Sequence, residues 1–176
     1  MIAKKSSVKK SSTEKRDIRL ILDNIRSVHN VGSIFRTAET LGISRIYCLG
    51  TTPTPLDRFG RVRSDFAKVS LGAENIVPWE HIDDGVGAEN VAVMLRKLKK
   101  AKFEIIALEQ AKNSVDYKSI EITSNAAIIL GNEVDGVSAG LLKLADKIAE
   151  IPLVGKKESL NVSVSAGIFL YRLLDR

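Results

Sequence analysis

The sequence predicts an α/β fold in which helices cover both faces of an open parallel β-sheet. The chain of 176 residues, 44% of them hydrophobic, has the length and apolar content of one compact domain with a full core. Short apolar runs alternate along it with longer stretches of helical periodicity. Runs such as "AAIIL" at 126–130 do not alternate between apolar and polar residues. Both faces of such strands are therefore expected to be buried, as in a parallel sheet between two layers of helices.

The first strand and the first helix are predicted at 18–24 and 30–41. The strand is the apolar run "IRLILDN", and the inner face of the helix is formed by Val31, Ile34, Phe35, Ala38 and Leu41. Asn30 stands where a helix prefers its N-cap, and Gly42 stands where a left-handed residue ends one. Gly32 costs a helix about 1 kcal/mol relative to alanine. This cost indicates that another group comes close to the backbone at Gly32.

The same patterns place the remaining elements. Further strands are predicted at 45–50, 75–79, 103–109, 125–131 and 147–153, and further helices near 61–70, 87–101, 138–145 and 161–175. The turn-rich segment at 50–65 is expected to be a surface loop that leads into a helix. Before the last helix, Ser159 and Asn161 are capping residue types. Its buried stripe is predicted to consist of Ile168, Phe169, Leu173 and Leu174.

Positive charge is concentrated near the N-terminus. Residues 1–19 hold seven Lys and Arg against two acidic residues, so they carry five of the six net positive charges of the chain. Such a segment is typical of a solvated tail, and equally of an arm that follows a phosphate backbone. We therefore divide the sequence into a basic arm at 1–17 and a domain at 18–176. Aromatic residues make up only 5% of the chain, so broad stacking on nucleobases is not an obvious mode of binding.

Several functional classes lack their signatures in this sequence. No apolar run is long enough to span a bilayer and the N-terminus has no signal-peptide core, which favours a soluble cytoplasmic protein without a membrane partner. The single cysteine, Cys48, lies in a strand-like run and is expected to be a small buried hydrophobe. With only His29 and His81 besides it, no metal site is expected. The segment at 85–90 does not complete a dinucleotide-binding loop, and the segment at 153–159 does not complete a phosphate-binding loop.

Three predicted strands are followed by unusual polar sequences, and such sheets bind ligands at the carboxyl ends of their strands. These sequences are "HNVGSIFRTAETLG", "ILGNEVDG" and "IPLVGKKESLNVSVSAG". Each alone is an ordinary turn or a capped helix. Together and in this order they resemble the SpoU (TrmH-like) family of RNA ribose 2′-O-methyltransferases, within the SPOUT superfamily. The matching residues are Asn30, Gly32, Arg36, Gly131, Glu133, Gly136, Ile151, Pro152, Ser159, Leu160, Asn161 and Val162.

The resemblance extends from about residue 20 to residue 174, and it implies a SPOUT fold with a bound cofactor. The C-terminal part of the sheet is then expected to form a deep trefoil knot that binds S-adenosylmethionine. By resemblance, this pocket is lined by Leu108, Gly131, Ile151, Leu153 and Leu160. An adenine needs apolar walls and a few backbone groups, which these residue types supply. Gly131 is expected to let the main chain come close to the cofactor.

The resemblance also implies a catalytic set consisting of Arg36, Asn30, Glu133, Ser159 and Asn161. Arg36 is expected near the ribose 2′-hydroxyl, either as the group that activates it or as a clamp on the phosphate and the developing alkoxide. Gly32 would leave space for the RNA backbone, and Glu133 would hold the loops by hydrogen bonds. In the family the active site draws on both subunits of a homodimer.

The predicted function is therefore S-adenosylmethionine-dependent methylation of a ribose 2′-hydroxyl in RNA. A tRNA is the favoured substrate, with guanosine as the candidate nucleotide, because residues 70–81 resemble the tRNA guanosine branch of the family. The alternatives are an rRNA 2′-O-methyltransferase, a non-catalytic RNA-binding protein of the same fold, and an enzyme with a substrate other than RNA. The presence of all five catalytic residue types favours catalysis.

Overall fold

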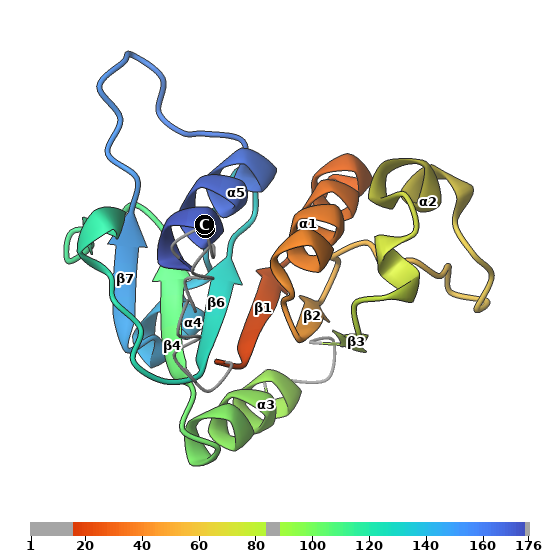
Figure 1. The fold of residues 1–176 in the computed structure, drawn as a ribbon, viewed down its shortest axis with the longest axis horizontal. Helices are drawn as coiled ribbons and strands as arrows, with labels where there is room; N and C mark the ends of the chain where they lie inside the picture. The colour runs from red at the N-terminus through yellow and green to blue at the C-terminus, as the bar shows by residue number, and fades with distance from the viewer. Residues whose placement is uncertain (1–15, 84–88, 175–176) are drawn as a thin grey trace, which may run out of the picture.

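The computed structural model describes residues 16–83 and 89–174, in which one parallel sheet is covered by helices (Figure 1). The strands of the sheet are β1 (Ile18–Asp23), β2 (Arg45–Leu49), β3 (Trp79–Ile82), β4 (Glu104–Leu108), β5 (Val115–Asp116), β6 (Ala126–Leu130) and β7 (Lys147–Glu150). The helices are α1 (Val28–Leu41), α2 (Ser64–Ser70), α3 (Glu89–Lys100), α4 (Ala139–Leu144) and α5 (Val162–Leu173), with short 3₁₀ turns η1 (Ala73–Asn75) and η2 (Tyr117–Ser119). The strand order is β3-β2-β1-β6-β4-β7-β5, and each described pair is parallel.

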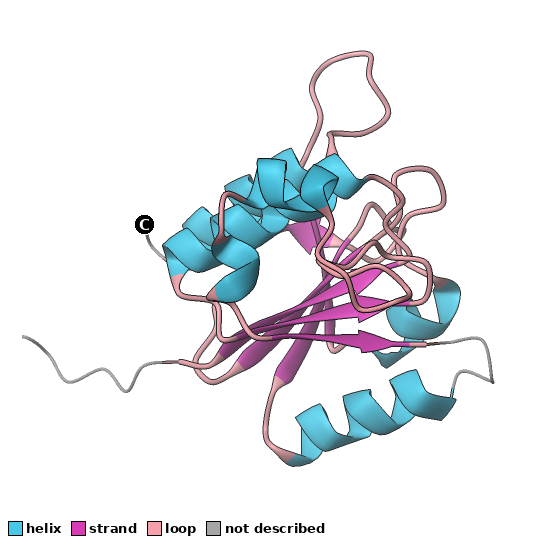
Figure 2. Ribbon diagram, turned by 90° about the vertical axis from the view of Figure 1, so that its right-hand side faces the viewer, coloured by secondary structure: helices cyan, strands magenta, loops and turns pink. Residues whose placement is uncertain are grey.

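Helices lie on both sides of the sheet, as the sequence predicts (Figure 2). In β1, Leu20 and Leu22 pack into one cluster together with Phe35 of α1 and Phe169 of α5. Ile21 faces the opposite way and packs with Leu95 of α3. Strand β6, near the middle of the sheet, is buried at every position. The continuous apolar runs therefore arise because each of their residues meets one of two helical layers.

The register of the central strands places several chain segments at one edge of the sheet. Leu130, at the end of β6, pairs with Leu108 of β4 and with Leu22 of β1, and Leu108 also pairs with Ala149 of β7. The segments that leave β1, β4, β6 and β7 therefore start side by side at the carboxyl edge. This is the edge at which open parallel sheets bind ligands.

Helix α1 begins earlier than predicted, so the expected N-cap at Asn30 is wrong. Ser27 is the N-cap, and its side chain accepts a hydrogen bond from the backbone N–H of Asn30. Ser27 is also a capping residue type and lies three positions upstream. The side chain of Asn30 is consequently available for other partners. The predicted end of the helix is confirmed, because Gly42 adopts a left-handed conformation with φ 71°.

The predicted role of Gly32 is also wrong, although its close contact is real. Gly32 is buried, and a Cβ atom there would lie 2.9 Å from Cβ of Val69 and 3.4 Å from the backbone nitrogen of Ser70. Both residues belong to α2. The group that approaches the backbone of α1 is therefore a neighbouring helix, and RNA has no access to it.

Local differences occur at the edges of the fold. The predicted strand at 75–79 is in fact Trp79–Ile82, because Ala73–Asn75 form a 3₁₀ turn and Ile76 is 66% exposed. The two-residue edge strand β5 was not predicted. Ile168 of α5 is 38% exposed, so it does not belong to the buried stripe. Cys48 is buried as predicted, and burial raises the pKa of its thiol to about 12.

Candidate functional site

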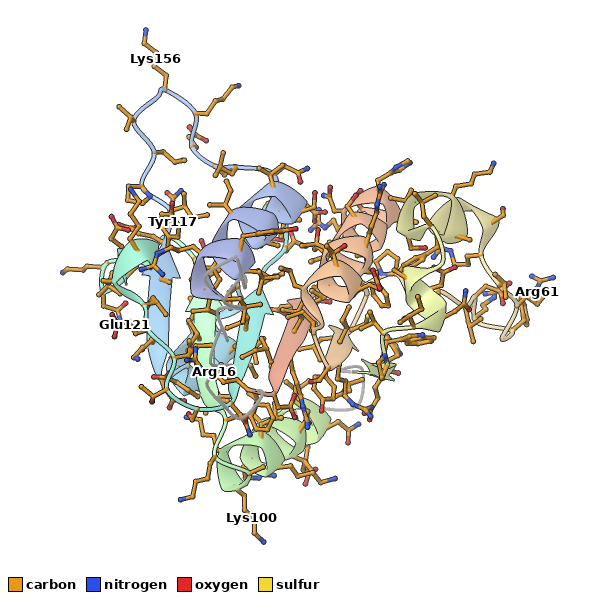
Figure 3. The ribbon with its side chains drawn as sticks, viewed as in Figure 1. Arg16, Arg61, Lys100, Tyr117, Glu121 and Lys156 are labelled. Atoms are coloured by element: carbon orange, nitrogen blue, oxygen red, sulfur yellow. The ribbon has the colours of Figure 1, made fainter. Side chains whose placement is uncertain are left out.

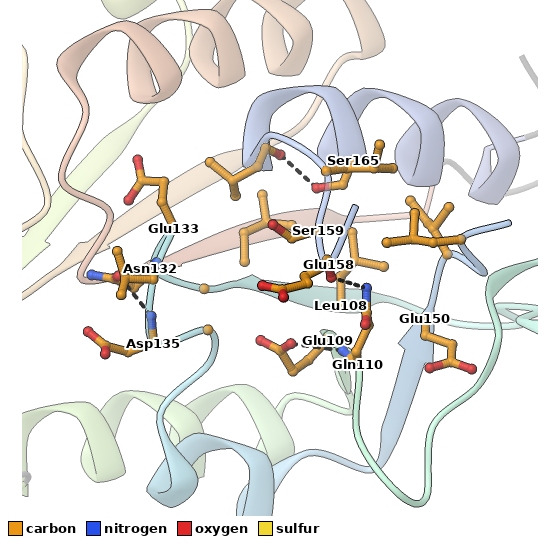
Figure 4. A pocket seen from close by; sticks show the side chains of 18 residues that line it. Leu108, Glu109, Gln110, Asn132, Glu133, Asp135, Glu150, Glu158, Ser159 and Ser165 are labelled. Atoms are coloured by element: carbon orange, nitrogen blue, oxygen red, sulfur yellow. Dashed lines mark hydrogen bonds between the residues drawn. The ribbon is translucent and has the colours of Figure 1, made fainter. Parts of the chain in front are cut away.

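A pocket lies at the carboxyl edge, between the segments that follow β4, β6 and β7 and the start of α5 (Figure 4). The residues predicted for the cofactor all line it: Leu108, Gly131, Ile151, Leu153 and Leu160. Glu133 and Ser159 from the predicted catalytic set line it as well. Residues from distant parts of the sequence therefore meet in one cavity because the parallel strands β4, β6 and β7 end at the same edge.

One wall of the pocket is the tight loop that follows β6. The backbone groups of Asn132 and Gly136 form two hydrogen bonds with each other, both 3.0 Å long. The side chain of Asn132 accepts hydrogen bonds from the backbone N–H groups of Val134 (2.8 Å) and Asp135 (3.1 Å). Its amide nitrogen donates to the carbonyl oxygen of Asn24 (2.7 Å). The loop is thus closed on itself and attached to the end of β1.

Gly131 has a second reason to be glycine, besides the expected approach of the main chain to the cofactor. A Cβ atom at Gly131 would lie 2.3 Å from the carbonyl carbon of Gly136 and 2.3 Å from the nitrogen of Val137. The main chain that comes close is the loop's own, so glycine is needed for the loop to close. Gly136, where the chain turns, has φ 70° and confirms the predicted turn.

Two carboxylates that sequence reasoning missed fix the end of this loop. Glu109 follows β4 and accepts hydrogen bonds from the backbone N–H groups of Val137 (2.7 Å) and Gln110 (2.8 Å). Asp23, at the end of β1, is only 3% exposed and accepts from the backbone N–H of Ser138 (2.7 Å). The available signal was an acidic residue at the end of a continuous apolar run in both strands.

The pocket combines apolar walls with acidic side chains. Its carboxylates are Glu109, Glu133, Asp135, Glu150 and Glu158, whereas its described lining includes no Lys, Arg or His. Glu150 accepts a hydrogen bond from the hydroxyl of Ser114 (2.8 Å). A concave site lined by one sign of charge concentrates ligands of the opposite sign. The pocket therefore favours a ligand with an apolar part and a positive charge.

Glu133 connects this pocket to the start of helix α1. Its carboxylate accepts hydrogen bonds from the backbone N–H groups of Arg26 (3.0 Å) and Ser27 (3.2 Å), and from the side-chain amide of Asn30 (2.8 Å). Partial burial acts to raise the pKa of Glu133, but these hydrogen bonds outweigh burial and hold the pKa below its ordinary value. Glu133 is consequently ionised at neutral pH.

A second hydrogen bond extends the connection to helix α5. The amide nitrogen of Asn161 donates to the side-chain oxygen of Asn30 (3.0 Å). The side-chain oxygen of Asn161 caps α5 by accepting from the backbone N–H groups of Ser163 (2.9 Å) and Val164 (3.4 Å). Asn30, Glu133 and Asn161 therefore form one chain of hydrogen bonds that joins all three sequence motifs.

Of the predicted catalytic set, Ser159 lines the pocket without joining this chain of hydrogen bonds, and Arg36 lies apart from both. It is exposed on α1 and does not line the pocket. No hydrogen bond or ion pair links its guanidinium to another residue within 16–83 or 89–174. Its charge is therefore available to a molecule outside this chain.

Three further observations concern metal binding, membrane spans and the predicted basic arm. Within 16–83 and 89–174, no group of three or more His, Cys, Asp and Glu side chains is placed to hold a metal ion. No helix of these ranges combines the length and apolarity needed to cross a membrane. Residues 1–15, most of the predicted basic arm, lie outside the described residues.

The sequence and the fold place this chain in one class of proteins, the SpoU methylases. The family model described as "SpoU rRNA Methylase family" matches residues 17–171, and the chain belongs to this family. It is 36% identical over 154 residues to an "uncharacterized tRNA/rRNA methyltransferase" of Archaeoglobus fulgidus. This alignment covers 88% of this chain and 62% of the relative. It is also 30% identical over 157 residues to a tRNA (guanosine(18)-2′-O)-methyltransferase of Aquifex aeolicus, in an alignment that covers 89% of this chain and 68% of the relative.

A solved structure of a relative gives the same result for the fold. The crystal structure of an AdoMet-bound rRNA methyltransferase from Sinorhizobium meliloti superimposes with a TM-score of 0.76 at 25% identity. The match covers 90% of this chain and 56% of that protein. The chain thus spans between about half and two thirds of the length of these relatives. The predicted α/β fold is confirmed, and the knot within it stays a prediction.

Proposed function

We propose that this protein transfers a methyl group from S-adenosylmethionine to the 2′-hydroxyl of a ribose in RNA. The observation that carries the proposal is the hydrogen-bonded chain of Asn30, Glu133 and Asn161. It brings three motifs together beside a pocket with apolar and acidic walls at the carboxyl edge of the sheet. The membership of the chain in the SpoU methylase family supports the same reaction.

The chemistry of the pocket fits S-adenosylmethionine. Leu108, Ile151 and Leu160 offer apolar walls for an adenine, and the strand ends offer backbone groups for its nitrogens. The bound cofactor supplies a methyl group on a positively charged sulfonium, which is a good leaving group. The surrounding carboxylates favour this cation, and they favour the neutral thioether product less because the charge has gone. The same charges therefore assist both binding of the cofactor and release of the product.

The residues of the chain act on the RNA by orientation and by charge. Glu133 is a positioning residue, because it is ionised and engaged in three hydrogen bonds that fix Asn30 and the start of α1. Arg36 carries a permanent charge and a planar fork that suits a phosphate or a developing alkoxide. The hydroxyl proton leaves to a phosphate or to water. Alignment of the reacting groups supplies several kcal/mol of the catalysis.

A tRNA guanosine is the proposed target, with rRNA as the second candidate. The Aquifex aeolicus relative is named for a tRNA guanosine, and the Sinorhizobium meliloti structure is named for rRNA. The presence of Arg36, Asn30, Glu133, Ser159 and Asn161 supports an enzyme over a non-catalytic RNA-binding protein. The basic arm at 1–17 supports RNA over a small-molecule substrate.

The protein is proposed to act as a homodimer. Val164 (50% exposed), Ile168 (38%) and Tyr171 (41%) recur at intervals of four and three residues and form an exposed apolar stripe along α5. Helix α5 packs beside α1, which carries Arg36, whose guanidinium has no partner among the described residues. A second copy seated on this stripe would cover its apolar surface, and Arg36 is proposed to serve the pocket of that partner.

Binding and methyl transfer can be tested on separate variants. Leu153→Arg places a cation in the acidic pocket and is expected to abolish S-adenosylmethionine binding in calorimetry. Arg36→Lys is expected to bind the cofactor like the wild type, yet to lose most transfer of labelled methyl to tRNA and rRNA transcripts. Arg96→Lys, on the exposed side of α3, is the matched control and should keep both activities. If the wild-type protein binds the cofactor but methylates no RNA, the proposed reaction is wrong, and the chain is instead a non-catalytic RNA-binding protein of the same fold.

A further inference from the structure

The loop between β2 and α2 contains a rigid turn built around Asp57. The backbone N–H of Asp57 donates to the carbonyl oxygen of Arg61, and the N–H of Gly60 donates to the carbonyl oxygen of Asp57, both at 2.9 Å. The Asp57 carboxylate accepts from the backbone N–H groups of Phe59 (2.8 Å) and Arg61 (3.0 Å). Gly60 takes the left-handed conformation that the turn requires, with φ 76°.

This turn holds an exposed aromatic side chain next to two arginines. Phe59 is 66% exposed. The guanidinium carbons of Arg58 and Arg61 lie 4.7 Å and 5.0 Å from the centre of its ring. Arg61 is fixed in addition by its hydrogen bond to the Asp57 carboxylate (2.8 Å). A single exposed phenylalanine is ordinary, but here the turn holds the ring together with two guanidinium groups, and this combination is what points to a ligand.

The chemistry of the turn matches an unpaired nucleobase. Bases that are not paired stack on aromatic rings and on arginine planes, while arginines contact the neighbouring phosphates. Arg58 has no hydrogen bond or ion pair among the described residues. Its side chain can therefore move from the ring to a phosphate without breaking a hydrogen bond or an ion pair. Arg61 stays bound to Asp57 and keeps its place at the ring.

The turn is separate from the cofactor pocket, because none of the residues 57–61 lines it. The turn leads into α2, which packs on α1 through the contact between Val69 and Gly32. In Figure 3, Arg61 lies at the right-hand end of the molecule. Lys156, in the segment that borders the pocket, lies at the upper left. Within one chain, a base on Phe59 would therefore lie outside the cofactor pocket.

We propose that the turn at 57–61 is a stacking site for an unpaired nucleobase of the RNA substrate, with Phe59 as the platform and Arg58 as a phosphate contact. The proposal rests on RNA being the substrate, as proposed above. It accounts for an exposed aromatic residue in a chain with few aromatic residues. It also predicts a preference for RNA with a single-stranded segment over a continuous duplex.

The test compares three variants of the full chain by RNA binding in the absence of cofactor. Phe59→Ala removes the platform, Phe59→Trp keeps an aromatic ring, and Ile76→Ala is the matched control because Ile76 is also 66% exposed. The probes are a labelled single-stranded oligouridine and a labelled blunt RNA duplex of the same length. Phe59→Ala is expected to weaken single-strand binding about ten-fold, since stacking of one base contributes about 1–3 kcal/mol. Duplex binding should change little.

The remaining variants and readouts make the result specific. Phe59→Trp should restore the affinity, and the fluorescence of its added indole should be quenched by the single strand. Ile76→Ala should match the wild type. Equal losses on both probes, an unchanged affinity in Phe59→Ala, or a wild type that does not bind the single strand would overturn the stacking site. A change of oligomeric state in Phe59→Ala would overturn it as well, because the turn would then be a subunit contact.

Cofactor binding and methyl transfer, measured in parallel, separate this proposal from the proposed function. All three variants should bind S-adenosylmethionine like the wild type. If the wild type shows the expected single-strand preference but transfers no methyl group, the stacking site stands and the proposed function fails. If transfer occurs and Phe59→Ala binds the single strand normally, the proposed function stands and the stacking site fails.

Discussion

The hydrogen bonds that join the three motifs depend on the negative charge of one residue, Glu133. Its carboxylate receives two backbone N–H groups from the start of α1 and the amide of Asn30, which in turn accepts a hydrogen bond from Asn161. Protonation would turn one of its oxygens from an acceptor into a donor that faces other donors. The charge of Glu133 is therefore linked to the shape of the site.

Glu133→Gln tests this link through the pH dependence of stability. The folded-state pKa of Glu133 lies below the ordinary value of 4.5, so its stabilising contribution is present above about pH 4.5 and is lost as the pH falls through the folded pKa. The variant should be less stable than the wild type at pH 7, and the difference should shrink as the pH falls below 4.5. Urea denaturation at a series of pH values measures it. A difference that stays constant with pH would show that the charge is not responsible.

The same residues show where sequence reasoning reached its limit at this scale. The sequence identified Asn30, Glu133 and Asn161 as a set, because their motifs match a family. It misplaced the helix cap at Asn30, since capping preference is local and Ser27 satisfies it equally well. Glu109 and Asp23 were missed, because their partners, the N–H groups of Val137 and Ser138, are distant in the chain.

At the scale of elements, the packing of α1 against α2 sets the position of the helix that carries Asn30 and Arg36. The contact depends on Gly32, which leaves room for Val69. The sequence showed correctly that Gly32 has a cost in a helix, but the partner could not be identified without the fold. Close approach of two helices and close approach of a ligand produce the same glycine in a sequence.

Gly32→Ala should therefore destabilise the protein although alanine is the better helix former. The gain of about 1 kcal/mol in helix propensity is set against overpacking of about 1–3 kcal/mol, so we expect a net loss on the order of 1 kcal/mol. Gly140→Ala in α4 is the control, because nothing lies within 4 Å of a Cβ atom there. It should be neutral or stabilising. Urea denaturation at one protein concentration compares the two, and a stabilised Gly32→Ala would contradict the packing argument.

The elements themselves were predicted best where burial is greatest. The central strands β1, β4 and β6 have apolar residues on both faces, and their runs are unmistakable in the sequence. The edge strands β3 and β5 were shifted or missed. Two of the four residues of β3 and both residues of β5 are exposed, so no continuous apolar run marks them. Edge strands have one neighbour and less buried surface, which weakens their sequence pattern.

At the scale of the whole molecule, the charges are divided between two functions. Carboxylates line the pocket, whereas Arg36 and the arginines of the turn at 57–61 carry positive charge elsewhere among the described residues. On the proposed function, this division would keep RNA phosphates out of the cofactor pocket, and the basic sequence at 1–17 would add to the attraction around it. In the proposed homodimer, a second chain would cover the apolar stripe on α5.

Mixing two inactive variants tests whether the subunits share an active site. Arg36→Lys keeps the pocket and Leu153→Arg keeps the arginine. If Arg36 serves the partner's pocket, each mixed dimer contains one site with an intact pocket and an intact arginine. Methyl transfer should then reappear when the two variants exchange subunits. A verified mixed dimer without activity would mean that Arg36 acts in the site of its own chain or that its assignment is wrong.

The central claim is that the methyl group reaches a ribose 2′-hydroxyl of RNA, and alkaline hydrolysis of the product tests it most directly. Alkali cleaves RNA through attack by a free 2′-hydroxyl, so a methylated ribose protects the following phosphodiester bond. RNA labelled by the wild-type protein with S-adenosylmethionine should release its labelled methyl in alkali-resistant dinucleotides, and Arg36→Lys should leave them nearly unlabelled. Label found in mononucleotides would mean that a base is methylated, and this result would contradict the account.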